Sequence, residues 1–439
     1  RDVERSRGLG DVYKRQVFTE FLSNYDDTKK ICKACGKKPA SKHIERDVYY
    51  CKECYLFKEL GKYITSYKYM TVSCEELHIK SKLAILDYFI YFVNEIRDES
   101  VFLYILDISS KKDSIYYKKY IANYIPRFSK EDIYNELYCA EEYKKYSDEE
   151  LQKEAREGIK KGLPKTFHHI ALSSLTQYED EEKKPKFKGR PFLGLLKADV
   201  DNLGMIFSLG LKDLKENKKS LFTVARFSAL SRMLNLFFTG YLPYLFSSYE
   251  KYRDIYTVFA GGDDLFLVGP WDKIIEFSYE MNEKFRQYTC YNPDITISAG
   301  IALIKSKQPI NSAASMAEKV LEESKKQGKN RLTVFGTTIK WEEFKELEGY
   351  KNTLEELLVN KDSKVTTSFI YSLLTIKDMK ERFESKHDPD FSCGRYMALF
   401  RYRLAKNIPQ IYWDKVAIFI KIIEKANIPI NWVLYKNRS

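Results

Sequence analysis

Two stretches of the sequence decide the fold. The first is PFLGLLKADVDNLG (191–204), an apolar run typical of a buried strand that ends in an Asp-Val-Asp-Asn-Leu-Gly segment. The second is IYTVFAGGDDLFLVG (255–269), in which two apolar strands flank a Gly-Gly-Asp-Asp turn and so predict a β-hairpin. Both stretches place carboxylates directly at the end of a buried strand.

The segments between and after these stretches alternate between helical and strand patterns. The resulting order, strand-helix-strand-turn-strand-helix-strand-helix-strand, contains the split βαβ arrangement of a ferredoxin-like palm and predicts an α+β fold. We expect Asn311 or Ser312 to cap the last of these helices and Gly328 to follow it. The further predicted elements are helices over 220–241, 271–287 and 311–327 and strands over 295–304 and 331–335.

Four regions are expected along the chain. Residues 1–16 (RDVERSRGLGDVYKRQ) are charged and lack periodicity, which indicates a non-native or disordered leader. Residues 17–190 are expected to form a zinc-bearing domain and residues 191–340 the palm. Helical patterns recur over 341–439, for example at 367–383, and predict a helical bundle.

Composition narrows the class of protein. The 439 residues are 44% hydrophobic and 31% charged, as in folded globular proteins, and they are too many for one ordinary core. No apolar run approaches the ~20 residues of a membrane span, and no secretory signal opens the chain. Eight cysteines are too sparse for a disulfide scaffold, so we expect a cytoplasmic protein. The net charge of +12 is compatible with nucleic-acid or phosphate ligands.

Four cysteines carry the spacing of a structural zinc site. Cys32 and Cys35 form one CxxC pair, and Cys51 and Cys54 form another after fifteen intervening residues. Two such turns complete a tetrahedron of thiolates with no open position, which favours a structural site over a catalytic one. The alternatives are four unrelated buried cysteines or a redox CxxC, which normally needs a single pair.

The carboxylates suggest a second metal site. If the two strands are neighbours, Asp199, Asp263 and Asp264 converge and repel one another unless a divalent cation lies between them. Oxygen ligands select Mg²⁺ or Mn²⁺, and two such ions could align an attacking hydroxyl with a phosphate. The absence of side chains at Gly261 and Gly262 would let a phosphate approach the turn. The alternatives are an ordinary hairpin turn and a solvated loop.

A basic segment, SKKQGKNR (324–331), is expected where a helix ends and a strand begins. Its lysines could bind a triphosphate. They could equally be the cations that commonly complement a helix C-terminus.

Taken together, KADVDNLG (197–204), FAGGDDLFLVG (259–269), KKQGKNR (325–331) and the cysteine element resemble the large palm-containing subunit of type III CRISPR effector complexes of the Csm subtype. The palm is also similar to that of diguanylate cyclases. The resemblance covers roughly residues 30–439. SRMLNLFF (231–238) fits the helix that follows the first metal motif.

The resemblance implies an enzyme that converts ATP into cyclic oligoadenylates by attack of a 3′-hydroxyl on an α-phosphate, with release of pyrophosphate. It implies Mg²⁺ or Mn²⁺ as cofactors, structural Zn²⁺, and other complex subunits, crRNA and target RNA as partners. The implied roles are Asp199, the carbonyl of Val200, Asp263 and Asp264 for the metals; Gly261 and Gly262 for the ATP phosphates; Lys325 and Lys329 for the triphosphate; and Ser231, with Asn235 one turn on, for adenine.

The chain departs from the family pattern at its start. Family members carry an N-terminal HD nuclease and a first palm, which we expect to be missing here, so that the fragment alone would be weak or inactive. Two other functions stay open: a diguanylate-cyclase-like enzyme that prefers GTP, against which the GGDD turn argues, and an inert scaffold subunit. The basic C-terminal bundle is expected to contact a partner subunit or RNA, or to be only a solvated face.

Overall fold

The computed structural model describes residues 30–45, 48–108, 115–118, 124–132, 135–139, 159–179, 185–209, 223–385 and 388–438. The predicted leader at 1–16 lies outside these ranges. The chain divides into two compact units, Arg1–Lys119 and Tyr120–Ser439. This division differs from the predicted boundary at residue 190.

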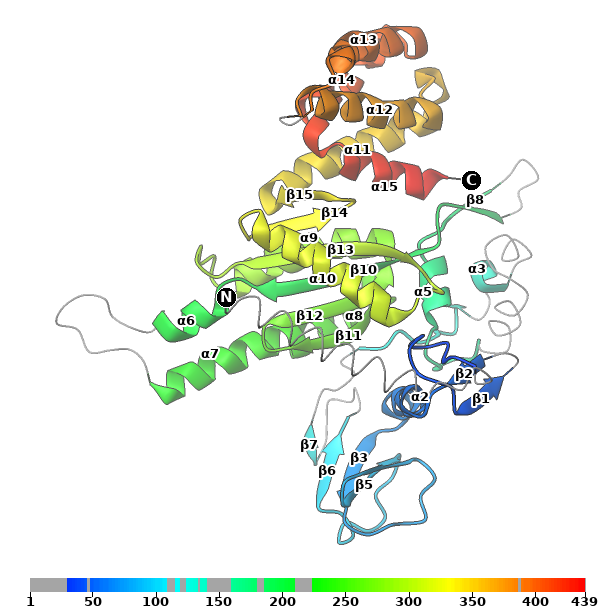
Figure 1. Cartoon of the computed structure of the whole chain (residues 1–439), viewed down its shortest axis with the longest axis vertical. Helices are drawn as coiled ribbons and strands as arrows, with labels where there is room; N and C mark the ends of the chain where they lie inside the picture. Colours follow the sequence, from blue (N-terminus) through cyan, green and yellow to red (C-terminus); the bar gives the residue numbers. More distant parts are fainter. Residues whose placement is uncertain are drawn as a thin grey trace, which may run out of the picture. The chain divides into compact units, whose positions relative to one another are not determined.

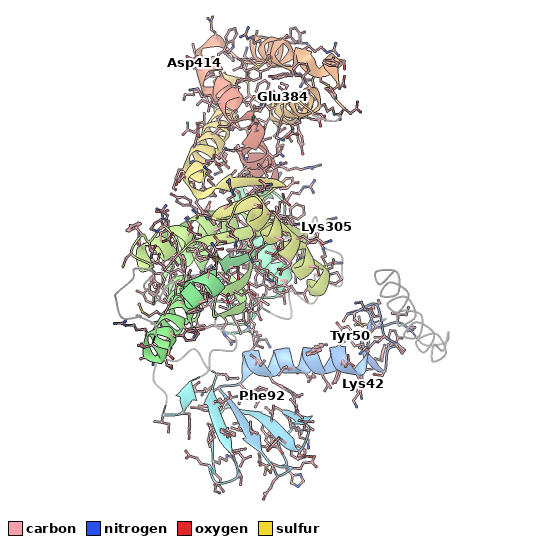
Figure 2. All side chains as sticks on the ribbon, turned by 60° about the vertical axis from the view of Figure 1, so that its left-hand side comes forward. Lys42, Tyr50, Phe92, Lys305, Glu384 and Asp414 are labelled. Atoms are coloured by element: carbon pink, nitrogen blue, oxygen red, sulfur yellow. The ribbon has the colours of Figure 1, made fainter. Side chains whose placement is uncertain are left out.

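The first unit contains a cysteine-bearing hairpin, a helix and a five-stranded sheet. The hairpin pairs β1 (Lys42–Glu45) with β2 (Val48–Tyr50), and α2 (Lys52–Ser66) follows it. Lys42 and Tyr50, which are partners in this register, lie at one end of α2, and Phe92 lies in the larger sheet (Figure 2). That sheet has the order β4-β5-β3-β6-β7, with strands Lys82–Ile85, Tyr88–Val93, Tyr69–Ser73, Tyr104–Asp107 and Tyr117–Lys118.

The second unit is built on the predicted palm sheet. Its six strands have the order β11-β12-β10-β13-β14-β15 (Figure 1). β10 is central and antiparallel to both β12 and β13, so the first carboxylate strand lies directly beside the hairpin. The strands are β10 (Phe192–Val200), β11 (Tyr256–Gly261), β12 (Asp264–Pro270), β13 (Ile297–Lys305), β14 (Arg331–Val334) and β15 (Thr337–Lys340).

Helices cover both faces of this sheet because β10 is apolar on both. Leu196 and Ala198 share one buried cluster with residues of α9 (Trp271–Tyr288). Leu193 and Leu195, whose side chains alternate to the other face, pack with α10 (Ile310–Lys326) and with α5 (Phe167–Leu172). The predicted helices at 271–287 and 311–327 are thereby confirmed.

Two details differ from the prediction. α10 begins after Pro309, which makes no side-chain cap, so neither Asn311 nor Ser312 is the N-cap. Proline with its fixed φ suits a helix start without a capping side chain. The helix predicted over 220–241 is described from α7 (Val224–Leu236), which continues through a π-helical turn (Phe237–Tyr241) into α8 (Leu242–Ser248).

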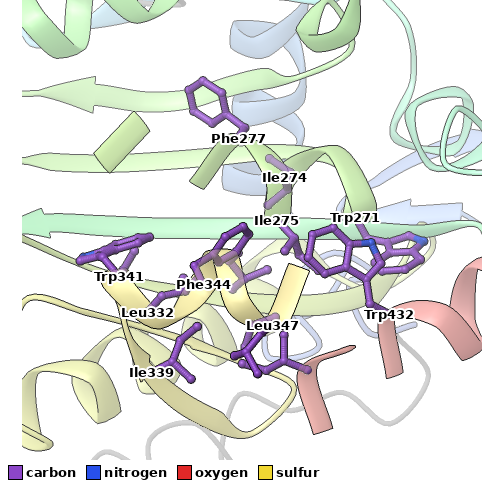
Figure 3. Packing of buried hydrophobic residues seen from close by; sticks show 14 of the residues in the cluster. Trp271, Ile274, Ile275, Phe277, Leu332, Ile339, Trp341, Phe344, Leu347 and Trp432 are labelled. Carbon is purple, nitrogen blue, oxygen red and sulfur yellow. The ribbon is translucent and has the colours of Figure 1, made fainter. Parts of the chain in front are cut away.

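The C-terminal helices are confirmed, and they share the apolar core of the palm. Trp271 of α9, Phe344 of α11 and Trp432 of α15 lie in one buried cluster (Figure 3). The helices are α11 (Phe344–Val359), α12 (Thr367–Phe383), α13 (Tyr396–Asn407), α14 (Trp413–Lys421) and α15 (Asn427–Asn437).

Described segments between residues 124 and 190 also join the palm. Lys165, fully buried, forms ion pairs with Asp132 at 3.2 Å and with Asp254 at 2.7 Å, just before β11. The remaining short elements are α3 (Glu136–Cys139), β8 (Thr176–Glu179), β9 (Pro185–Lys188) and α6 (Leu203–Leu209). None of the helices in the described ranges combines the length and apolar character needed to cross a membrane.

Candidate functional site

The carboxylates at the ends of β10 and β12 face each other. Asp199 pairs directly with Asp264 in the antiparallel register, so the two side chains project from the same face of the sheet. Gly261 is the partner of Asp264 on the other side, which leaves only Gly262 and Asp263 in the turn. Gly262 has φ +65°, a conformation that glycine adopts without cost.

Two hydrogen bonds hold this turn in place. The backbone N–H of Val200 donates to the carbonyl oxygen of Asp263 at 3.2 Å, which ties the hairpin tip to the end of β10. The backbone N–H of Gly262 donates to Oδ1 of Asn235 at 3.1 Å, which ties the tip to α7. Asn235, expected from the resemblance to lie near adenine, therefore also positions the turn.

The electrostatics of the pair are those of carboxylates with too little positive charge around them. Burial raises the pKa of Asp199, and Asp263 and Asp201 add to the rise, although Lys325 Nζ at 2.7 Å from Asp199 Oδ2 opposes it. Burial likewise raises the pKa of Asp264. The positive charge of Lys197 opposes this rise, and the neighbouring carboxylates add to it. Lys197 lies 4.0 Å from Asp264 and also pairs with Glu318.

The residues present fit a hard divalent cation. Oδ1 of Asp264 is buried and has no hydrogen-bond partner, so an acceptor atom is left over at this edge. The mutual repulsion of the carboxylates gives a cation a second reason to bind. Their oxygens do not form a closed cage, however, because within the described ranges only the four cysteines bring three or more ligand atoms within 4.8 Å of one another. The carboxylates are thus less tightly gathered than the sequence predicted.

Asp201 has a different role from its neighbour. It is 1% exposed and accepts hydrogen bonds from Ser298 Oγ at 2.6 Å, Thr296 Oγ1 at 2.8 Å and the backbone N–H of Asn330 at 3.0 Å. This carboxylate therefore fastens the end of β10 to β13 and to the basic loop. The sequence offered only the Asp-x-Asp spacing as a signal, and nothing in it named the partners.

The other candidate nucleotide contacts lie around the same edge. Lys325 is at the end of α10, and Lys329 Nζ donates to Asn202 Oδ1 at 2.5 Å, so the basic loop reaches the Asp199 segment. Ser231 is exposed on α7, one turn before Asn235. Lys197 and Glu318 are charged neighbours that the sequence did not single out.

The predicted cysteine cluster forms in the first unit. Ligand sulfurs of Cys32, Cys35, Cys51 and Cys54 all lie within 4.8 Å of one another. Burial raises the pKa of Cys32, but backbone hydrogen bonds from Cys35, Cys51 and Ala34 outweigh it and bring the pKa down to about 6. A thiol that ionises this readily is suited to bind Zn²⁺.

The backbone shapes the cluster locally. Gly36 has φ +63° and its N–H donates to the carbonyl of Cys32 at 2.8 Å, which closes the first CxxC turn. Cys51 is the N-cap of α2, and its sulfur accepts from the backbone N–H of Cys54 at 3.5 Å. The four thiols could hold a zinc ion.

A palm sheet with an aspartate-ended central strand and a GGDD hairpin beside it defines a palm of the nucleotide cyclase and polymerase type. A family model described as Cas10/Cmr2, second palm domain, matches residues 192–333. The chain is 41% identical over 182 residues, 37% of its length and 22% of the relative's, to a CRISPR system single-strand-specific deoxyribonuclease Cas10/Csm1 (subtype III-A) of Methanocaldococcus jannaschii. It is 33% identical over 221 residues to the protein of the same description from Mycobacterium tuberculosis, covering 46% of this chain and 26% of that protein.

Solved structures agree on the fold. Csm1 of T. onnurineus superposes with a TM-score of 0.57 at 19% identity, covering 85% of this chain and 50% of that one. A Csm1–Csm4 cassette in complex with one ATP superposes with a TM-score of 0.56 at 19% identity, covering 88% of this chain and 50% of that one. The chain is therefore similar to Csm-type Cas10 proteins, with a region that matches their second palm domain, and it spans about a quarter of these two curated relatives and half of these solved chains.

Proposed function

We propose that the palm binds ATP at the edge formed by β10 and the GGDD hairpin and joins adenylates through 3′–5′ phosphodiester bonds, as the cyclic oligoadenylate synthase of a type III CRISPR complex. The observation that carries the proposal is the in-register pair Asp199 and Asp264 with its unpartnered buried oxygen. Solved relatives of the same fold include Csm1–Csm4 cassettes in complex with one ATP, with pppApA and with cA4.

The residues of this edge would have different roles in the reaction. Asp199, Asp263, Asp264 and the carbonyl of Val200 would hold Mg²⁺ or Mn²⁺. When bound, these ions would supply positive charge that activates the attacking 3′-hydroxyl and stabilises the leaving pyrophosphate. Asn235 and the Val200 N–H keep the turn rigid, so that a phosphate can approach Gly262, where no side chain blocks it.

The ammonium group of Lys325 can pair with either of two anions, Asp199 or the triphosphate. In the structure its ammonium group neutralises Asp199. With a divalent cation held by Asp199, Lys325 would be available to contact the triphosphate. Lys329 on the same loop lies beside the Asp199 segment through its hydrogen bond to Asn202. The positive charge of Lys325 would then stabilise the negative charge on the leaving pyrophosphate.

The test is made in the complete complex, with the remaining subunits, crRNA and target RNA as the proposed partners. The double substitution Asp263→Ala and Asp264→Ala should abolish oligoadenylate formation from ATP, measured by mass spectrometry of the products. Assembly with RNA should be unchanged. Asp294→Ala, at an exposed position near β13, is the control and should retain full product formation.

Two outcomes would overturn the proposal. Unchanged oligoadenylate output in the double variant would leave this chain the role of a scaffold. Tighter binding of GTP than ATP in the presence of Mn²⁺, measured by thermal shift, would favour the diguanylate-cyclase-like alternative.

A further inference from the structure

A cavity of about 240 Å³ opens on the basic loop, and of its lining residues only Lys329 also has a role in the proposed reaction. Four of its lining residues are cationic, and they come from α9, the loop after α10, β14 and β15. One acidic residue lines it. The cationic residues are Arg286, Lys329, Arg331 and Lys340, and the acidic one is Glu342.

The cations are brought together against their own repulsion. Arg331 and Lys340 are direct partners in the antiparallel register of β14 and β15. Like charges directly opposite each other destabilise a sheet. In the part of the chain that the structure describes, neither residue forms an ion pair with a carboxylate. The fold therefore holds two like charges side by side without an ion pair, although Glu342 lines the same cavity and Glu343 interacts electrostatically with Lys340.

A second observation points to a missing partner. Nε of Arg331 is buried and has no hydrogen-bond acceptor. The guanidinium group packs over Gly328, where an added Cβ would lie 3.4 Å from Nε. Gly328 has φ +119°, and Lys329 and Asn330 are also left-handed. A backbone of this shape is retained only when its surroundings hold it, here through the Asn330 N–H and Asp201.

The size and charge of the cavity select the ligand. Pockets for drug-sized molecules run to about 300–1,000 Å³, so this cavity is suited to a smaller anion. Guanidinium groups bind phosphate oxygens in a forked, charge-assisted geometry, and a nearby ammonium adds a point charge. We propose that Arg331, Lys340 and Arg286 form a binding site for the phosphate groups of a small ligand, either free pyrophosphate or the terminal phosphates of a nucleotide.

This site is separate from the carboxylate edge, although the loop 328–330 contacts both through Lys329 and Asn202. The proposal does not depend on adenylate chemistry. It can be tested with divalent metals removed by EDTA, so that binding at the carboxylates does not contribute.

The test is calorimetric titration of the 439-residue chain with pyrophosphate and, separately, with ATP. Arg331→Gln and Lys340→Gln should each weaken binding about tenfold, because each removes one charge-assisted contact. Lys340 is exposed, so its substitution leaves the core intact. Lys421→Gln, which removes an exposed cation from α14, should bind as the unsubstituted chain does. Weakening for both ligands assigns recognition to the phosphates alone, and weakening confined to ATP assigns the site to nucleotides.

Thermal unfolding separates binding from a structural role. Pyrophosphate should raise the melting temperature of the unsubstituted chain and not that of Arg331→Gln or Lys340→Gln. Without the anion, Lys340→Gln should melt at the same temperature or higher, because a repulsion is lost. Absence of pyrophosphate and ATP binding by the unsubstituted chain, or equal binding by the variants, overturns the proposal. So does loss of binding on Lys325→Gln combined with retention on Arg331→Gln, because the anion would then lie at the carboxylate edge.

Discussion

Substitution of Asp201 by alanine should destabilise the palm more than any change to the neighbouring carboxylates. The side chain is 1% exposed and accepts three hydrogen bonds, from Ser298, Thr296 and the Asn330 backbone. A hydrogen bond to a charged group contributes about 1.5–3 kcal/mol, so the three together contribute on the order of 4–9 kcal/mol. Water that enters the space left by the carboxylate would satisfy part of this loss, and we expect a cost of about 4 kcal/mol.

The assay is unfolding followed by tryptophan fluorescence. All four tryptophans lie in the second compact unit, so the signal reports on the palm and its helices alone. For a unit of this size, 1 kcal/mol corresponds to about 2 °C, and Asp201→Ala should lower the melting temperature by roughly 8 °C. Asp201→Asn retains one acceptor oxygen, so its melting temperature should lie between those of Asp201→Ala and the unsubstituted chain.

The control is Asp294→Ala, which removes an exposed carboxylate close to the same strand and should change stability by less than about 0.5 kcal/mol. If the free energy of unfolding of Asp201→Ala is within about 1 kcal/mol of that of the unsubstituted chain, the three hydrogen bonds do not fasten β10 to β13, and the reasoning is refuted.

Three further outcomes are expected. Gly300→Ala would place a methyl group against the backbone of α10 and should cost about 2–3 kcal/mol or more in unfolding free energy. Gly349 lies inside α11 with open space around an added Cβ, so Gly349→Ala should stabilise the chain by about 0.5–1 kcal/mol. Equal melting temperatures of the two variants would contradict this. The pKa values of Asp199 and Asp264 are raised in the metal-free folded chain, so these two groups bind more protons there than in the unfolded chain, and their contribution to stability should fall as pH rises above 3.8. Asparagine at both positions should remove this contribution. In EDTA the melting temperature of the variant should therefore gain on that of the unsubstituted chain as pH rises, and a constant difference would disprove the cause. Cys32→Ser should lower the zinc content measured by atomic absorption, while serine at an exposed cysteine outside the cluster should not.

The palm was predictable because its signals are local. β10 is buried on both faces, so it appears as a continuous apolar run, and the GGDD hairpin has strands of matching length on each side. The cysteine cluster was predictable for the same reason, since the CxxC spacing alone places two sulfurs together.

Features that depend on distant partners were not predictable. The role of Asp201 rests on Thr296 and Ser298, about a hundred positions later. The repulsive pair of Arg331 and Lys340 appears only once β15 is placed beside β14. The five-stranded sheet of the first unit has short strands of mixed exposure, such as β4, and no alternation clear enough to identify them from sequence.

The single apolar cluster that joins the sheet to the last helices means that the palm cannot be trimmed at residue 340. Trp432 and Phe344 cover the same interior as Trp271 and Ile275 (Figure 3). In a chain shortened at that point Trp271 and Ile275 would lose this cover, and an apolar surface open to water would favour aggregation over soluble protein. Shortened forms for biochemical work should therefore keep α15, even where only nucleotide binding is of interest.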